Sequence, residues 1–214
     1  MYDRRINSVN LSAWKDRLTA GKYDAPLAAL YDAADAAQAR YARLCEEYLR
    51  NFGDAPDALL LSAPGRTELA GNHTDHQLGI VLCAAVTRDI AAAAAPTENN
   101  TVEIVSEGFG RVRVSLGERA PREEETGTTA ALIRGVAAGF AAQGLCIGGF
   151  RACVHSLVPA GGGLSSSAAF EVLLGTMLNY LYNDGKVSAV EIAQIAQFAE
   201  NEYFGKPCGL MDQM

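Results

Sequence analysis

The hydrophobic positions along this 214-residue chain change between helical and strand periodicity. Apolar residues recur at every third or fourth position over residues 26–52, which predicts an amphipathic helix that ends at Gly53. Short apolar or alternating runs bounded by turn residues follow, and each run predicts a strand. These runs cover residues 59–62, 79–86, 90–95, 102–105 and 112–116.

The second half of the chain is richer in helical pattern. Helices are expected over residues 128–143 and 165–182, with a strand over residues 150–157 between them. Ser188 and Glu191 stand at capping-box spacing, so another helix is expected to begin there. Strands that come first, with helices after and among them, predict an α+β layer structure.

Composition and charge narrow the class of partner. The chain is 49% hydrophobic and 20% charged, which is typical of a globular protein, and its net charge is −7. An acidic surface argues against general binding to nucleic acid or to an anionic membrane, so we expect small-molecule partners. No apolar run approaches a spanning helix, no signal peptide is evident, and the five scattered cysteines include no CxxC pair. A cytoplasmic protein with free thiols is the expectation.

A glycine-rich loop before the helix at 165–182 is the first candidate for chemistry. Residues 159–169 read Pro-Ala-Gly-Gly-Gly-Leu-Ser-Ser-Ser-Ala-Ala. Consecutive glycines let backbone N–H groups approach an anion, and a helix that begins at the serines adds the positive end of its dipole. Nucleotide phosphates are therefore the leading ligand. The alternative is a flexible loop with a serine N-cap, because short glycine motifs recur by chance.

A second polar cluster lies in residues 63–77, where an apolar strand pattern ends. Fixed carboxylates, amides, imidazoles and a guanidinium together suit a polyhydroxylated ligand such as a sugar. The cluster consists of Arg66, Glu68, Asn72, His73, Asp75 and His76. One alternative is a metal site on the two histidines and the aspartate, although no further His or Cys pair is placed to complete it. The other alternative is a solvated loop.

The third cluster follows the capped helix and contains Glu200 and Asp212. Phosphoryl transfer from a nucleotide needs oxygen ligands for Mg²⁺, donors that stabilise anions, and a carboxylate that receives or polarises the proton of the acceptor hydroxyl. The three clusters together supply each of these parts. Taken alone, Glu200 would be a surface helix residue and Asp212 a turn residue.

These three motifs, in this order, resemble the GHMP kinases, and among them the galactokinases. Residues 65–75 are similar to the galactokinase signature GRxNxxGEHTD, residues 159–169 resemble the phosphate motif PxGxGLSSSAA, and residues 209–213 resemble the segment G-I-M-D-Q. The resemblance covers residues 39–214. It implies an α+β GHMP-kinase N-terminal domain of the ribosomal protein S5 domain 2-like type, a mixed sheet packed with helices, preceded by a helical extension over residues 1–38.

The resemblance also implies a role for each motif residue. Asp212 matches the catalytic aspartate, acting as a base or as an electrostatic partner of the anomeric hydroxyl, and Arg66 matches the arginine that keeps this aspartate ionised. The expected reaction converts ATP and galactose into galactose 1-phosphate and ADP. The remaining matches are Ser167 and Glu200 for Mg²⁺, Gly161, Gly162, Gly163, Ser165, Ser166 and Ser167 for the ATP phosphates, and Asn72, His73, Asp75 and Gly209 for the sugar.

Two departures from the family pattern leave the substrate open. Glu68 and Asn72 stand where the family has Asn and Glu, and His76 stands where it has Tyr, so another hexose is an alternative to galactose. Family members also continue into a second domain after the catalytic loop, whereas Asp212 lies two residues from the last residue of this chain. We therefore expect negligible turnover from these 214 residues alone. A sugar- and nucleotide-binding sensor, an inactive fragment, or a GHMP kinase for a non-sugar alcohol such as mevalonate are the other hypotheses.

Overall fold

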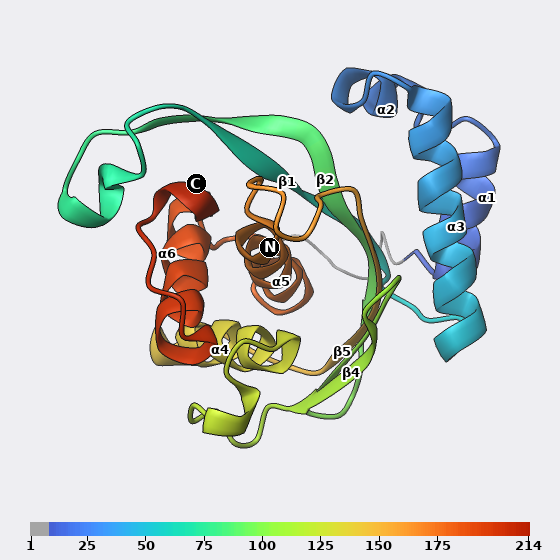
Figure 1. Ribbon diagram of the computed structural model, residues 1–214. Helices are drawn as coiled ribbons and strands as arrows, with labels where there is room; N and C mark the ends of the chain where they lie inside the picture. Colours follow the sequence, from blue (N-terminus) through green and yellow to red (C-terminus); the bar gives the residue numbers. More distant parts are fainter. Residues whose placement is uncertain (1–8) are drawn as a thin grey trace.

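The computed structural model describes residues 9–214, which fold into helices on both faces of one sheet (Figure 1). The helices are α1 (Leu11–Thr19), α2 (Asp24–Leu30), α3 (Ala34–Phe52), α4 (Thr129–Ala142), α5 (Ser166–Tyr182) and α6 (Ala189–Ala199). The strands are β1 (Leu59–Ala70), β2 (Leu82–Pro96), β3 (Thr101–Ser106), β4 (Gly110–Ser115) and β5 (Phe150–Ser156).

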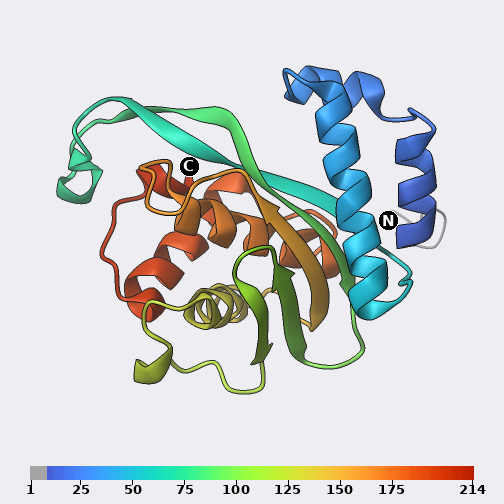
Figure 2. The ribbon, with the colours of Figure 1, turned by 45° about the vertical axis from the view of Figure 1, so that its right-hand side comes forward.

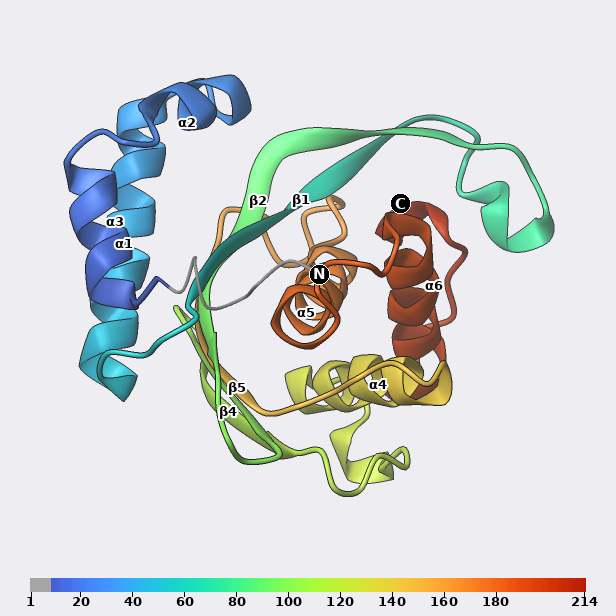
Figure 3. The same ribbon diagram turned by 180° about the vertical axis from the view of Figure 1, so that it is seen from behind.

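The sheet is mixed, with strand order β1-β2-β5-β3-β4. β3 and β5 run parallel, and the other neighbours are antiparallel. One face packs against α4, α5 and α6, and α1 to α3 form a separate layer on the opposite face, as Figures 1 and 3 show from front and back. The predicted α+β layer structure is confirmed.

The centre of β2 separates two hydrophobic cores. Its five consecutive alanines, residues 91–95, are all fully buried. Because side chains alternate along a strand, Ala92 and Ala94 belong to the core beneath α4, α5 and α6, while Ala91, Ala93 and Ala95 belong to the core beneath α3. The small side chains allow both helical layers to lie close to the sheet.

The single helix expected over residues 26–52 is wrong, because the chain leaves the helical conformation between α2 and α3. Tyr31 is extended, with φ −133° and ψ 138°. Its hydroxyl donates to Asp89 Oδ2 at 2.5 Å and lies 2.9 Å from the hydroxyl of Tyr41. These tertiary hydrogen bonds fix the break. The expected domain boundary between residues 38 and 39 falls inside α3 and stays a prediction.

Three strand predictions also need correction. The strand expected over residues 59–62 continues to Ala70, and the runs at 79–86 and 90–95 form one strand, β2, which begins at Leu82. Beyond residue 64, β1 and β2 pair only with each other and form a hairpin arm that reaches past the helices (Figure 2). The arm is not packed between two helical layers, so it carries polar residues that interrupt the apolar pattern expected of a strand.

The remaining sequence predictions agree with the structure to within one or two residues at their ends. These are the strands at residues 102–105, 112–116 and 150–157 and the helices at 128–143 and 165–182. The capping box is confirmed at α6, where the Ser188 hydroxyl accepts from the Glu191 N–H and the Glu191 carboxylate accepts from the Ser188 N–H. Within residues 9–214, no helix combines the length and apolarity needed to cross a membrane.

Candidate active site

A cavity of about 480 Å³ lies where the arm, the glycine loop and the C-terminal segment meet. This volume is in the range of small-molecule binding sites. The candidate residues named from the sequence all line the cavity except Glu68, Asn72 and Glu200. The lining consists of Arg66, His73, Asp75, His76, Gly161, Gly162, Gly163, Ser165, Ser166, Ser167, Lys206, Pro207, Cys208, Gly209 and Asp212.

A bulge in β1 brings Arg66 to the glycine loop. The register of the β1–β2 pair shifts between Pro64 and Arg66, and such bulges redirect the side chains that follow. A Cβ on Gly65 would lie 2.8 Å from the backbone oxygen of Leu164, so only glycine allows this close approach. The Arg66 N–H donates to the same oxygen at 3.3 Å, which joins the strand to the loop.

Arg66 connects the glycine loop to Asp212, which is 146 positions away in the sequence. Its Nε and Nη2 donate to Asp212 Oδ1 at 2.9 and 2.5 Å, and its Nη1 donates to the Gly163 carbonyl at 2.7 Å. Burial alone would raise the pKa of Asp212, but hydrogen bonds from Ser165 and Arg66 and the charges of Arg66 and Lys206 hold this pKa below its usual value. Asp212 is therefore ionised at neutral pH.

The end of the arm contributes the imidazoles of His73 and His76 and the carboxylate of Asp75 to the cavity. The His73 N–H donates to Glu68 Oε1 at 3.0 Å, and its Nε2 lies 3.4 Å from Glu68 Oε2. Asp75 Oδ2 accepts from the Met211 N–H at 2.9 Å. A Cβ on Gly209 would lie 1.9 Å from this Asp75 oxygen, so glycine is required for the C-terminal segment to approach the arm.

Glu68 and Asn72, which are exchanged relative to the family pattern, occupy different environments. The Glu68 carboxylate is mostly buried beside His73, whereas Asn72 is exposed and lies outside the cavity lining. Asn72 and His73 both adopt left-handed backbone conformations, with φ 53° and 54°. A sugar contact by Asn72 stays a prediction. The alternative of a metal held by the two histidines and Asp75 gains no support, since no group of three or more His, Cys, Asp or Glu side chains is placed to hold a metal ion among the described residues. His76 Nδ1 lies 2.6 Å from the His73 carbonyl instead.

The glycine loop turns sharply before α5. Gly161 and Gly163 have φ values of 70° and 76°, which glycine adopts readily. Ser165 is also left-handed, with φ 55°, and makes no side-chain N-cap bond, so α5 begins at Ser166 with its first N–H groups at the cavity. A helix N-terminus that follows a glycine loop is a favourable site for anions.

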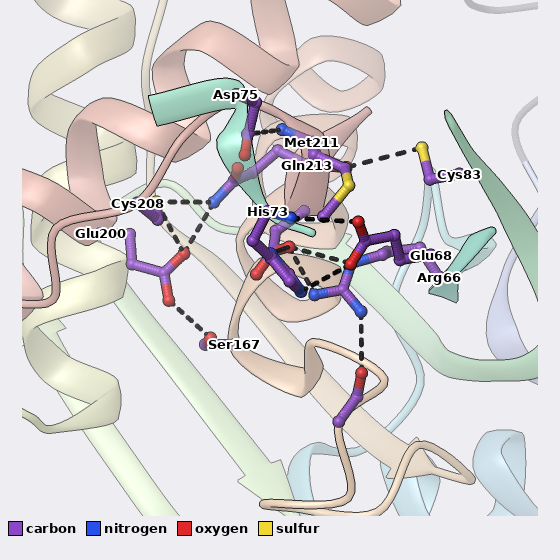
Figure 4. A network of polar contacts seen from close by, with 12 residues as sticks. Arg66, Glu68, His73, Asp75, Cys83, Ser167, Glu200, Cys208, Met211 and Gln213 are labelled. Carbon is purple, nitrogen blue, oxygen red and sulfur yellow. Dashed lines mark hydrogen bonds and ion pairs between the residues drawn. The ribbon is translucent and has the colours of Figure 1, made fainter. Parts of the chain in front are cut away.

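Glu200 lies behind the cavity wall and is fully buried at the start of a π-helical turn, Glu200–Phe204. Its Oε1 accepts from the Ser167 hydroxyl at 2.7 Å and from Lys206 Nζ at 3.0 Å. Its Oε2 accepts from Gln213 Nε2 at 2.7 Å (Figure 4). One carboxylate and one hydroxyl beside a phosphate-type loop fit Mg²⁺, which is usually held by one or two carboxylates together with substrate phosphates.

Several neighbours of the site were given no role from the sequence. Lys206 and Cys208 line the cavity, and Glu171 and Gln213 are buried behind it. The signal available for Lys206 and Cys208 was their position inside the third cluster, between Glu200 and Asp212. Glu171 follows Ser167 by four residues and so lies on the same face of the helix. That spacing was the available signal for Glu171, and it was overlooked because charged residues are usually expected at the surface.

A second cavity of about 410 Å³ adjoins the glycine loop on the side of β3 and β4. It shares Ser166 and Ser167 with the first cavity, and most of its other walls are apolar. Phe109, Leu132 and Phe170 are among these apolar side chains. The two serines therefore line both the first cavity, which is polar, and the second, which is mostly apolar.

Two family models match this chain in the order of its motifs. The galactokinase galactose-binding signature matches residues 46–96, and the N-terminal domain of the GHMP kinases matches residues 130–214. The first region includes the whole arm, and the second includes the glycine loop, Glu200 and Asp212.

Galactokinases are among the similar curated proteins. The human galactokinase is 39% identical over 173 residues, and that of Clostridium tetani is 31% identical over 170 residues. These matches cover 78% and 79% of this chain but 43% of each relative. The chain therefore spans less than half the length of the relatives that it matches.

Solved structures agree with this comparison. The Lactococcus lactis galactokinase complexed with galactose superposes with a TM-score of 0.72 and 31% identity, over 78% of this chain and 44% of the other. The Methanococcus jannaschii mevalonate kinase gives a TM-score of 0.60 at 18% identity over 72% of this chain and 49% of the other, a likeness of fold alone. This chain therefore contains a GHMP kinase N-terminal domain together with the galactokinase galactose-binding signature.

Proposed function

We propose that this chain forms the sugar- and phosphate-binding part of an ATP-dependent sugar 1-kinase that converts galactose into galactose 1-phosphate. The observation that carries the proposal is the ion pair between Arg66 and Asp212, which lines the cavity between the glycine loop and the hairpin arm. An ionised carboxylate thus lies between a candidate sugar site and a candidate phosphate site.

Asp212 receives the proton of the anomeric hydroxyl in the proposed reaction. The hydroxyl oxygen forms a bond to the γ-phosphorus of ATP, and the bond from that phosphorus to the β-phosphate oxygen breaks to release ADP. Arg66 serves this step in two ways. It keeps Asp212 ionised before the reaction, and its charge beside the Gly163 carbonyl stabilises the anionic transferring group.

The glycine loop and the start of α5 bind the nucleotide phosphates through backbone N–H groups in this proposal. Ser167 and Glu200 would hold Mg²⁺, which neutralises charge on the phosphates when it is bound. Lys206 would complete the positive side of the site, since its ammonium reaches the same Glu200 oxygen as Ser167. The apolar cavity beyond Ser166 and Ser167 suits the base and ribose.

The sugar would lie against His73 and Asp75, two of the polar side chains with which the arm lines the cavity; His73 Nδ1 lies 4.0 Å from Asp212 Oδ1. Equilibrium dialysis with radiolabelled galactose tests this directly. The parent chain should bind galactose, Asp75→Ala should bind it at least about tenfold more weakly because a charged acceptor is lost, and Glu98→Gln on an exposed loop should bind as the parent does. Equal binding by all three proteins contradicts the placement.

Activity is measured on the protein purified from its source organism, as ADP release with galactose, glucose, mannose or mevalonate. Galactose-dependent release supports the proposal, release with another hexose corrects the sugar, and release with none refutes it. Asp212→Asn should abolish turnover while galactose binding persists. A sensor would keep its response to ligand in the same variant.

A further inference from the structure

A buried carboxyl group lies behind the candidate active site and has no part in the reaction proposed above. Glu171 is fully buried on α5, one turn after Ser167. Its Oε2 accepts from Gln213 Nε2 at 3.3 Å. Its Oε1 and the Gln213 Oε1 are the buried side-chain polar atoms that lack a hydrogen-bond partner in the described part of the chain.

The buried pair of Glu171 and Gln213 is unfavourable for folding. A buried carboxyl with an unpartnered oxygen loses hydration that the fold does not replace, and an apolar side chain of similar size avoids that loss. Burial, together with the negative charge of Glu200, raises the pKa of Glu171 to about 9, so the group is neutral at pH 7. Stability therefore does not account for Glu171.

The Gln213 amide stands between two carboxyl groups. Its Nε2 carries two hydrogens and lies 2.7 Å from Glu200 Oε2 and 3.3 Å from Glu171 Oε2. Glu200 is consequently held on its inner oxygen, while its outer oxygen faces Ser167 and Lys206. Figure 4 shows one oxygen of the Glu200 carboxylate directed to Ser167 and the other directed to Gln213 and Cys208.

We propose that Glu171 is a positioning residue, which fixes the Gln213 amide so that Glu200 presents its outer oxygen beside Ser167. Gln213 directly follows Asp212, so the same contact restrains the turn that carries the candidate base. The inference rests on the proposed function in assigning Glu200 to cation binding. Groups that orient a metal ligand from behind typically change metal affinity by about 10- to 100-fold when they are removed.

Two substitutions at Glu171 separate positioning from structural support. Glu171→Leu removes the acceptor and fills the space with an apolar group, so its melting temperature should equal or exceed that of the parent. Glu171→Gln keeps an acceptor for Gln213 Nε2 and resembles the neutral carboxyl. A matched control is Asn179→Leu. It removes a buried side-chain amide on α5 that exchanges two hydrogen bonds with the backbone of Val187, and it should lower the melting temperature.

Two readouts apply to these variants of the whole chain. Titration of Mn²⁺ with the nucleotide analogue AMP-PNP, followed by electron paramagnetic resonance, should show at least about tenfold weaker binding in Glu171→Leu and binding within about twofold of the parent in Glu171→Gln. Hydrogen exchange should become several-fold faster over residues 208–213 in Glu171→Leu and stay unchanged in Glu171→Gln and Asn179→Leu.

The outcomes are distinguishable. Parent-like exchange over residues 208–213 in Glu171→Leu overturns the inference, and so does a large fall in melting temperature in both Glu171 variants, which would indicate structural support. If the parent fails to bind Mn²⁺ with AMP-PNP, the proposed function fails. Hydrogen exchange then still decides the inference, because it needs no ligand.

Discussion

Replacing Gly209 with alanine tests whether the contact between the C-terminal segment and the arm holds the site together. The new Cβ would lie 1.9 Å from Asp75 Oδ2 and 2.3 Å from its Cγ, whereas real Cβ contacts are essentially never shorter than 3.0 Å. The Asp75 carboxylate must therefore move by more than 1 Å. That movement breaks its hydrogen bond with the Met211 N–H, which is 2.9 Å long.

The magnitude follows from the bond that is lost. A hydrogen bond to a charged group contributes about 1.5–3 kcal/mol, so Gly209→Ala should lower the free energy of unfolding by about 2 kcal/mol. For a chain of this size, that change lowers the melting temperature by about 4–8 °C. Galactose binding should weaken in parallel, because Asp75 leaves its place in the cavity wall.

Thermal and urea unfolding followed by circular dichroism provide the assay. Gly117→Ala is the control, because its Cβ would meet no atom closer than Ser115 Oγ at 3.7 Å. A double-mutant cycle with Asp75→Ala is decisive, since two residues in contact give non-additive effects. If Gly209→Ala destabilises the chain equally with and without the Asp75 side chain, the clash is not the cause and the reasoning is refuted.

Three further outcomes are expected. Arg40→Met should lower the free energy of unfolding by about 3–5 kcal/mol in urea, because it strands the buried Asp89 carboxylate to which Arg40 is paired; a loss below about 1 kcal/mol would contradict this. Iodoacetamide at pH 7 should label the exposed Cys146 at least about 100-fold faster than Cys208, whose pKa burial raises to about 12, and peptide mass spectrometry measures both rates. The pKa of Asp212 is lowered by folding, so its contribution to stability is present above about pH 4 and is lost as the pH falls through the lowered value; the difference in unfolding free energy between the parent and Asp212→Asn should therefore shrink from about pH 6 to about pH 3, and a constant difference would be evidence against it.

The sequence predicted those elements whose pattern reflects burial on one face. The helix 165–182 and the capping box at Ser188 are examples, because apolar spacing and local hydrogen bonds determine both. The break at Tyr31 was missed because it depends on a hydroxyl contact with Asp89, which lies 58 positions away. The full length of β1 was missed because the arm has no second layer to impose alternation.

The candidate site was likewise predictable from local sequence pattern but not from tertiary contacts. Its motifs could be found because glycine loops and polar clusters are local in sequence, and their meeting at one cavity followed from the resemblance rather than from spacing. The contact of Arg66 with both Gly163 and Asp212 is a tertiary fact. Glu171 was missed because charged side chains are usually solvated, and only the packing of α5 shows that this one is enclosed.

The five alanines at the centre of β2 restrict how this sequence can drift during evolution. Each is fully buried, and neighbouring positions face opposite helical layers. A larger residue at 91, 93 or 95 would push away the α3 layer, and one at 92 or 94 would push away the layer that carries the glycine loop. Lineages should therefore keep small residues along this stretch even where the chemistry of the site diverges, and enlargement on one face should be accompanied by reduction in the helix that it meets.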